Sequence, residues 1–378
     1  MWIYILIFVI ILVSYLQMSK IAKNVKFLAI VMTFLAIFVG ISDMLGGYDR
    51  YIYAELFDRM ADVTELGGNP WKSDSFQFYG GEFGYGTLCA LLSFITKNRY
   101  IFIFIVTTII YILLFISLRD YTNNYPFAVL LFLALWFFFT FTYLRQVLSA
   151  TTAWLAIRYI SRRNLKKFLL VWFIAYSFHN SALVILPMYF VPIKKFSERT
   201  ILYIMAIALF IGITPFPMLL FEAYGDINQD RTNVEVLASE GTFRIAYLIE
   251  AALFLYLILS QYKRIPKKPK TIVLMNMALV FCAILLVFIR SENGGRLGWF
   301  YMIGCISTVT FICHLKNNSQ LKFAMLLISF YLYLRILTGW TTMLSPYKTF
   351  FTNGVRAHDG MHYLYEYDDK YDKDKFYR

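Results

Sequence analysis

Residues 100–118 read YIFIFIVTTIIYILLFISL, an uncharged run of the length at which one helix crosses a bilayer. Comparable apolar runs recur along the whole chain. They cover roughly residues 1–18, 27–45, 127–143, 168–191, 200–221, 244–262, 271–289, 297–314 and 321–340. Two further runs, 83–97 and 145–160, are shorter or more polar. The pattern predicts an all-α polytopic membrane protein with about 10–12 transmembrane helices.

The composition excludes a soluble protein. Of the 378 residues, 60% are hydrophobic and 16% are charged, whereas soluble domains have about 45–50% apolar and about 25% charged residues. The net charge is 36 − 23 = +13, but the positive residues lie in short loops, so we expect no nucleic-acid partner. The four cysteines all lie in apolar runs without a CxxC motif, which predicts neither a disulfide framework nor a zinc site.

Loop charge predicts which side of the membrane each loop faces. Lys and Arg dominate four short loops, which we expect on the cytoplasmic side: 20–26, 158–167, 194–199 and 263–270. Acidic residues dominate two stretches, which we expect as extracytoplasmic loops over 46–82, a large loop after the second helix, and over 222–243. The sequence thus predicts one transmembrane domain over 1–340 and a polar tail over 341–378.

The two weak runs conflict with this topology if both cross the membrane. Two full crossings would place the basic loop 158–167 on the extracytoplasmic side. One of the runs 83–97 and 145–160 is therefore predicted to be partial or re-entrant, which is tolerated only inside protein or beside a cavity.

Four arginines at or near the ends of apolar runs are candidates for an anion site. They are Arg145, Arg244, Arg290 and Arg296. Ionisable groups in such places are costly, and a guanidinium binds phosphate through two parallel hydrogen bonds. As a set they suit a lipid-linked diphosphate. The alternative is that each pairs with a neighbour, as Arg290 with Glu292, or extends to the lipid head groups.

Residues of the first acidic loop are candidates for sugar binding. Asp49, Tyr53 and Phe57 recur every four residues, so on a helix they share one face. A carboxylate beside aromatic rings suits a sugar, although Asp49 alone also fits a solvated loop acid. Glu82 lies on a glycine-rich turn before an apolar run, where an acid is also favoured by the helix dipole.

His179 interrupts the apolar run 168–191 among Ser177, Asn180 and Ser181. Such a histidine can be a general base or a phosphate ligand, or a hydrogen-bonded core residue. We expect the other three, His314, His358 and His362, in loops or the tail. Because no second histidine or carboxylate follows at ligand spacing, no metal is predicted.

Six segments in order resemble the EpsG family, which is related to Wzy-type O-antigen and capsule polymerases. They are Gly47-x-Asp49 with Tyr53 and Phe57, Glu82-Phe-Gly-Tyr85, Arg145-Gln-Val-Leu-Ser-Ala150, Phe178-His-Asn-Ser-Ala-Leu-Val-Ile-Leu-Pro187, Arg296-Leu-Gly-Trp-Phe-Tyr301 and Pro346-Tyr347. The Arg145 and His179 segments are the most specific. Phe83 stands where the family pattern has proline.

The resemblance implies a multi-pass protein of the bacterial cytoplasmic (inner) membrane. It implies a glycosyltransferase that joins undecaprenyl-diphosphate-linked oligosaccharides at the extracytoplasmic face, in O-antigen (lipopolysaccharide), capsule or exopolysaccharide synthesis. The partners would be the oligosaccharide donor and acceptor, membrane lipid, a chain-length regulator and a flippase. No cofactor is expected, because the lipid diphosphate is itself the leaving group.

On this hypothesis the four arginines hold the diphosphate and stabilise its developing charge. Asp49 is the predicted base, with Glu82 and His179 as rivals, and Tyr53 and Phe57 contact sugar. A flippase or exporter is the main alternative, and it would spread its cationic residues through the bilayer depth. A sugar O-acyltransferase is another, and it would need a histidine beside an acidic partner.

Overall fold

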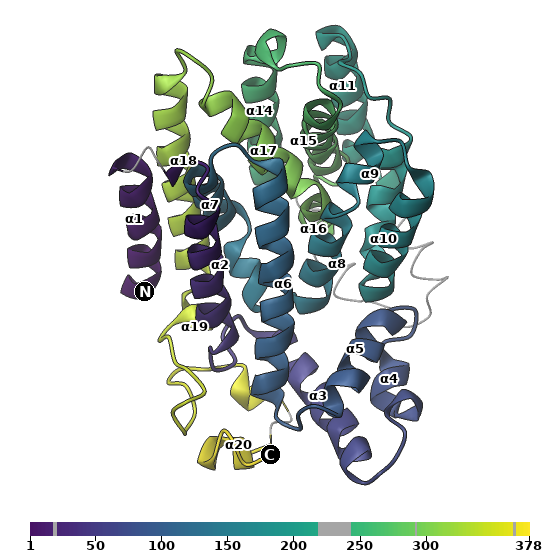
Figure 1. Ribbon diagram of the computed structural model, residues 1–378, viewed down its shortest axis with the longest axis vertical. Helices are drawn as coiled ribbons and strands as arrows, with labels where there is room; N and C mark the ends of the chain where they lie inside the picture. The colour runs from purple at the N-terminus through teal and green to yellow at the C-terminus, as the bar shows by residue number, and fades with distance from the viewer. Residues whose placement is uncertain (18–20, 218–242, 292, 366–367) are drawn as a thin grey trace. The chain divides into compact units, whose positions relative to one another are not determined.

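A computed structural model describes residues 1–17, 21–217, 243–291, 293–365 and 368–378 (Figure 1). Over these residues the regular structure is helical, and the one extended pairing is an isolated bridge between Ser42 and Thr349. The prediction of an all-α protein is confirmed. The second acidic loop, 222–243, lies almost wholly outside the described residues, as does Glu292.

The chain divides into two compact units. The first comprises residues 1–155, 169–183 and 317–378, and the second comprises 156–168 and 184–316. The sequence analysis placed no boundary within 1–340. The tail after residue 340 belongs to the first unit.

The first unit carries most of the helices. Its elements are α1 (Trp2–Gln17), α2 (Val25–Gly40), α3 (Tyr48–Glu65), η2 (Pro70–Lys72), α4 (Asp74–Phe78), α5 (Phe83–Ser93), α6 (Arg99–Tyr121), α7 (Tyr125–Leu135), η3 (Phe137–Phe141), α8 (Leu144–Trp154), most of α10 (Leu165–Phe178), α18 (Ser319–Gly339), α19 (Thr341–Leu344), η7 (His362–Leu364) and α20 (Lys370–Lys373). Asparagine side chains begin several of them: the Oδ1 atoms of Asn24, Asn98 and Asn124 accept backbone N–H groups at the starts of α2, α6 and α7.

The second unit is built around α15. Its elements are α9 (Ile157–Ser161), most of η4 (Asn180–Tyr189), α11 (Glu198–Ile213), α14 (Ile245–Ser260), η5 (Tyr262–Arg264), α15 (Pro269–Val287), α16 (Asn293–Gly298), η6 (Trp299–Tyr301) and α17 (Met302–Cys313). Helices α9, α11, α14 and α17 all pack against α15. The thirteen buried residues of α15 follow from this central position.

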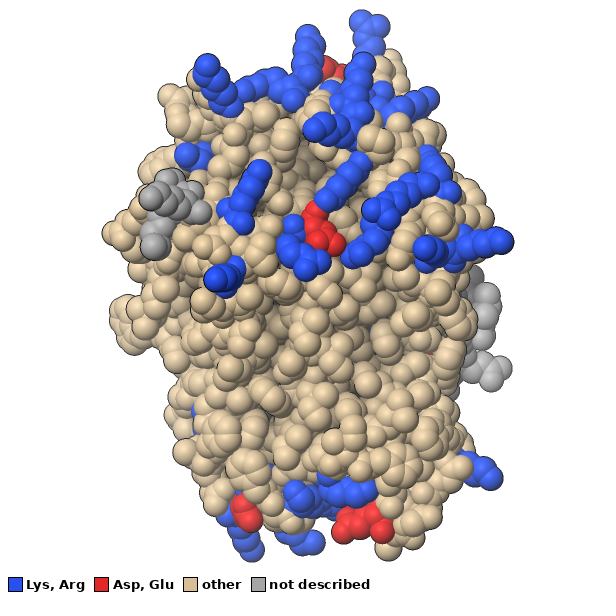
Figure 2. Space-filling view, in the orientation of Figure 1, with Lys and Arg blue, Asp and Glu red and all other residues tan. Residues whose placement is uncertain are grey.

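Four of the described helices are long and apolar enough to cross a membrane: Arg99–Tyr121, Pro269–Val287, Gly294–Cys313 and Ser319–Gly339. Shorter apolar helices accompany them at Trp2–Gln17, Val25–Gly40, Phe83–Ser93, Tyr125–Leu135, Asn180–Tyr189 and Ile245–Ser260. In Figure 2 much of the visible surface is tan, without charged side chains. The chain is a multi-pass membrane protein.

Helix α5 corresponds to the weak apolar run 83–97 and packs against α3. Both of its ends stay beside α3, because Ser93 Oγ lies 2.7 Å from Thr64 Oγ1 and Arg99, just after α5, pairs with Asp58. Figure 1 shows α3, α4 and α5 lying together. With 11 residues each, α5 and α8 are both shorter than the roughly 20 that a crossing needs, so their lengths do not decide which run is partial.

Helix α8, also 11 residues long, packs beside the 23-residue helix α6. It begins next to Arg145, and at its other end the carbonyl of Trp154 accepts a hydrogen bond from Tyr121, the last residue of α6 (3.0 Å). Shortly after that end of α6, the N–H of Tyr125 donates to Ala22 in the basic loop 20–26 (2.7 Å). These contacts place the end of α8 near loop 20–26 within the first unit, and the membrane side of loop 158–167 stays a prediction.

The apolar run 168–191 is not one crossing helix, as the sequence analysis expected, but a helical hairpin. Helix α10 ends at Phe178, and η4 returns from Asn180. In the first unit, Trp172 Nε1 donates to the carbonyl of Ala182 (3.0 Å). In the second, Arg163 donates to the carbonyls of Tyr189 and Val191. Hydropathy alone cannot separate a crossing from such a hairpin, because both are apolar along their length.

Candidate functional site

Three of the predicted site residues meet in the first unit, although they lie far apart in the sequence. Arg145 Nη1 donates to Glu82 Oε2 (2.5 Å), and the N–H of Asn180 donates to the other carboxylate oxygen, Oε1 (3.3 Å). His179 Nδ1 lies 3.6 Å from the same oxygen. The start of α5, the first turn of α8 and the turn of the hairpin therefore converge on one carboxylate.

Glycines allow this approach. A Cβ on Gly84 would lie 2.1 Å from Ser177 Oγ, and one on Gly81 would lie 3.5 Å from Asn180 Nδ2. Only glycine at 84 lets α5 pack this closely against α10. Glu82 is the N-cap residue of α5, yet its side chain makes no capping hydrogen bond. The carboxylate points to Arg145 instead, which argues against a purely local role at the helix end.

The hydrogen bonds of His179 fix where its proton lies. The backbone N–H of Ser181 donates to Nδ1 (3.1 Å). Since a backbone N–H can only donate, Nδ1 carries no proton, and the neutral ring carries it on Nε2. In the neutral ring, the 3.6 Å separation between Nδ1 and Glu82 Oε1 is not a hydrogen bond, and the ring N–H is on Nε2.

Aromatic rings surround the guanidinium of Arg145. Its Nε donates to the hydroxyl of Tyr53 (3.4 Å), and its Cζ lies 5.2 Å from the ring centre of Tyr53 and 5.7 Å from that of Tyr79. Tyr85 packs against both tyrosines. Burial raises the pKa of Tyr53 to about 12, and the negative charge of Asp49 adds to the rise. Tyr53 is therefore a neutral hydrogen-bonding group at physiological pH.

Asp49 and Phe57 lie on α3 with Tyr53, as the four-residue spacing predicted, but in different surroundings. Asp49 is half-buried in the first turn of the helix. Phe57 is completely buried and stacks on Phe102, with 4.1 Å between the ring centres. Its ring has no exposed surface for a sugar in this structure, so nothing here supports its predicted role.

Arg50 was missed by the sequence analysis, which counted it as a loop charge. It is completely buried, and its guanidinium donates to the carbonyls of Val39, Ser42, Leu45 and Phe141 at 3.1–3.4 Å. These carbonyls end α2, form the loop before α3 and end η3. Arg50 thereby positions its neighbour Asp49 and the segment that leads to Arg145. Tyr79 and Tyr85 were also missed, although both flank the glycine-rich turn around Glu82.

The other three predicted arginines belong to the second unit. The N–H of Arg244 donates to the carbonyl of Ile289 (2.9 Å), and Arg290 Nη1 donates to that of Ile213 (3.2 Å). These contacts join the starts or ends of α11, α14 and α15, and Arg290 and Arg296 are exposed. Arg145 lies in the first unit, so the convergence of all four arginines stays a prediction.

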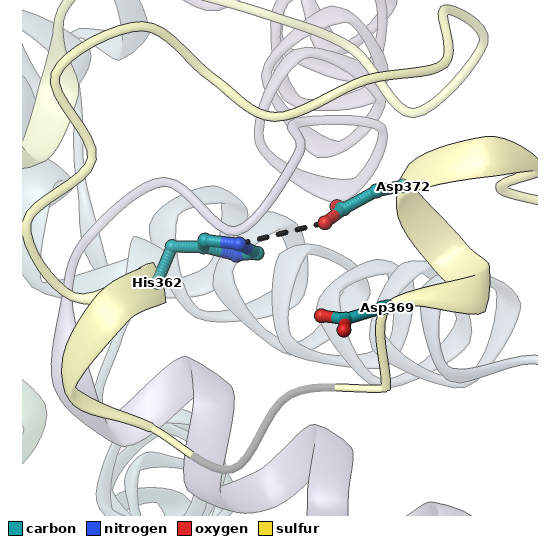
Figure 3. Close-up of side chains that lie close together, drawn as sticks. All are labelled: His362, Asp369 and Asp372. Carbon is teal, nitrogen blue, oxygen red and sulfur yellow. Dashed lines mark ion pairs between the residues drawn. The ribbon is translucent and has the colours of Figure 1, made fainter.

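The tail holds a separate cluster of His362, Asp369 and Asp372 (Figure 3). Their potential ligand atoms lie within 4.8 Å of one another, and His362 Nε2 is 3.4 Å from Asp372 Oδ2. These residue types bind transition metals in proteins. However, Lys375 Nζ lies 3.8 Å from Asp372 Oδ1 and already brings a positive charge to the carboxylate. We therefore assign the cluster to the internal contacts of the tail.

A comparison with known proteins identifies the family. The model of the EpsG family matches residues 25–349, which is most of the chain and includes every predicted site residue. No curated protein and no solved structure matches the chain. The chain belongs to the EpsG family, a family of Wzy-like polysaccharide polymerases.

Proposed function

We propose that this protein is a glycosyltransferase that joins lipid-linked oligosaccharide repeat units at the extracytoplasmic face of a bacterial cytoplasmic membrane. The observation that carries the proposal is the meeting of Glu82, Arg145 and His179 beside Tyr53. Three polar groups from separate segments form one buried arrangement that local packing alone does not require.

In the proposed reaction, a hydroxyl oxygen of the acceptor sugar attacks the anomeric carbon of the donor. The bond between that carbon and the lipid diphosphate breaks, and its electron pair leaves with the diphosphate. The hydroxyl proton passes to a base. The protein has to stabilise the growing negative charge on the diphosphate, which preorganised donors do most effectively.

Arg145 and His179 are the proposed diphosphate ligands of the first unit. Arg145 uses Nε for Tyr53 and Nη1 for Glu82, so its Nη2 group is the proposed donor to a phosphate oxygen. Glu82 holds the guanidinium in place. His179 carries its proton on Nε2 when neutral, and we propose phosphate binding for it over the general-base role. In the second unit, Arg244, Arg290 and Arg296 are proposed to bind the same diphosphate.

Asp49 remains the proposed base. Glu82 accepts hydrogen bonds from Arg145 and Asn180, one at each carboxylate oxygen, so its carboxylate is already used to hold these two groups. Asp49 lies four residues before Tyr53 on α3, so the two residues share one face of the helix. It would accept the proton of a hydroxyl group that Tyr53 helps to position.

A sugar O-acyltransferase is a second candidate, because a carboxylate does lie near His179. An acyltransfer dyad would need Nδ1–H to donate to that carboxylate. Here Nδ1 accepts from Ser181 instead. A flippase is the third candidate, and the experiment below separates it from a polymerase.

The test is complementation of a deletion strain with Arg145→Ala and His179→Ala, followed by gel analysis of the surface polysaccharide. Loss of a polymerase leaves single repeats on the acceptor, whereas loss of a flippase leaves none. Arg119→Ala is the matched control, because Arg119 is an exposed arginine of the same unit whose guanidinium contacts Asp120 and the ring of Phe115, both on α6 and outside the site. Normal polymer length in both site variants, with the protein inserted, would refute the proposed roles.

A further inference from the structure

The C-terminal tail is a packed part of the first unit. Tyr371 is completely buried, and Lys375, Asp359 and Arg356 are exposed by only 1%, 1% and 4%. Buried charges are costly unless they are paired and hydrogen-bonded. The partners of these tail residues therefore show what holds the tail in place.

Three tail residues bind polar groups along one side of α3. Asp359 Oδ2 accepts the hydroxyl of Tyr51 (2.7 Å), and the hydroxyl of Tyr371 donates to Asp58 Oδ1 (3.1 Å). Arg378 Nη1 pairs with Asp62 Oδ1 (2.7 Å). Positions 51, 58 and 62 are spaced by seven and four residues, which places them on one helical face.

The loop before α3 is held by the tail as well. Asp43 pairs with Lys348 Nζ (2.6 Å) and with Lys375 Nζ (3.2 Å), and its backbone N–H donates to the carbonyl of Lys348 (2.8 Å). The bridge between Ser42 and Thr349 lies next to these contacts. The tail therefore fixes both the body of α3 and its point of entry.

Asp49 and Tyr53 lie on a different face of α3 from Tyr51, because each is two residues away from Tyr51 along the helix. Tyr53 contacts Arg145 there. A helix is stiff over this length, so a contact that holds one face also sets the position of the other.

We propose that the C-terminal tail is a clamp that positions α3 for the reaction, with Tyr51, Asp359 and Tyr371 as positioning residues. The consequence for activity rests on the function proposed above, whereas the clamp itself does not. Sequence analysis treated the tail as a polar extension, and the structure gives it a place in the scaffold of the site.

Hydrogen exchange on the purified full-length protein in lipid nanodiscs tests the clamp directly. The variant Asp359→Asn/Tyr371→Phe weakens the contacts with Tyr51 and Asp58, together with the Arg356–Asp359 pair and the bond from the N–H of Arg99 to Tyr371, without creating large cavities. We expect the amides of α3 to exchange on the order of tenfold faster, since each lost bond involves a charged group. Peptides of α15, in the second unit, should not change. Lys373→Ala, an exposed position of the tail, is the control, and Tyr371→Phe alone replaces the double variant if that fails to fold.

A charge exchange provides the rescue. Asp62→Arg and Arg378→Asp should each loosen α3, and the two together should restore slow exchange. Polymer synthesis is measured in parallel, and should fall with the loosening of α3 and return with the rescue.

The outcomes separate the two proposals. Unchanged exchange in α3 of the tail variants would overturn the clamp. Faster exchange with unchanged polymer synthesis would overturn the positioning role. If α3 exchanges faster in the tail variants but the wild-type protein makes no polymer, the clamp is supported and the proposed function is refuted.

Discussion

Glu82 and Asn180 lie 98 residues apart in the sequence, yet the backbone N–H of Asn180 donates to Glu82 Oε1 at 3.3 Å. The bond ties the start of the short helix α5 to the turn of the α10–η4 hairpin. A side chain of one segment thereby satisfies a backbone N–H at the turn of the other.

Breaking the Glu82–Arg145 pair should destabilise the protein as well as inactivate it. Glu82→Ala leaves a guanidinium without its carboxylate in a site where both side chains are at least 86% buried (exposures of 6% and 14%), and we expect a loss of about 3 kcal/mol. Glu82→Gln keeps an acceptor and should lose less. Thermal unfolding of the purified variants measures this. Equal stability of Glu82→Ala and the wild type would mean that the pair is not formed.

The two amide substitutions of His179 should differ in effect. Gln places its NH₂ group near the position of Nε2, whereas Asn reaches only the position of Nδ1. Since Nε2–H is the proposed phosphate donor, His179→Gln should keep part of the polymer synthesis and His179→Asn should lose it. Gel analysis at matched protein levels distinguishes them. The reverse order would point to a role of Nδ1, as in a general base.

The contact between α5 and α10 should depend on Gly84. In Gly84→Ala the new methyl group meets Ser177 Oγ at 2.1 Å and Ser177 Cβ at 2.7 Å, and we expect a loss of about 1–3 kcal/mol. Polymer synthesis should fall too, because α5 carries Glu82. Adding Ser177→Gly removes both clashing atoms and should restore part of each loss. A double variant no better than Gly84→Ala would contradict this packing.

Arg50→Lys should be costly although it keeps the charge. One ammonium cannot reach the four carbonyls that the guanidinium joins, and unsatisfied buried groups of this kind cost about 1.5–3 kcal/mol. Arg59→Lys is the control, since Arg59 is 60% exposed and pairs with Glu55 on the same helix; its effect should stay below about 0.5 kcal/mol. Chemical or thermal unfolding compares the two.

Cysteine labelling should confirm the predicted sides of the membrane. The native cysteines Cys89, Cys282, Cys305 and Cys313 are all buried, so the background is low. A membrane-impermeant maleimide should label Tyr48→Cys in intact cells, because Tyr48 is 53% exposed beside Asp49. Lys23→Cys should be labelled only after the cells are opened. Labelling of both in intact cells would contradict the predicted topology.

The sequence predicted the features that depend on local pattern. Apolar runs identified the helices, a four-residue spacing placed Asp49 and Tyr53 on one helix, and isolated polar residues pointed to Glu82, Arg145 and His179. Three features were beyond its reach. The hairpin in 168–191 has the same hydropathy as a crossing helix. The sequence around Arg50 does not distinguish it from an exposed loop arginine. The tail is held by polar pairs between residues more than 300 positions apart, such as Tyr51 and Asp359.

The proton position on His179 is set by the main chain, since the donor to Nδ1 is the peptide N–H of Ser181. Replacing the side chain of Ser181 leaves this N–H in place. Nearly every substitution at Ser181 should therefore leave the tautomer of His179 unchanged. Proline alone lacks the N–H, and would release the ring to take up either tautomer.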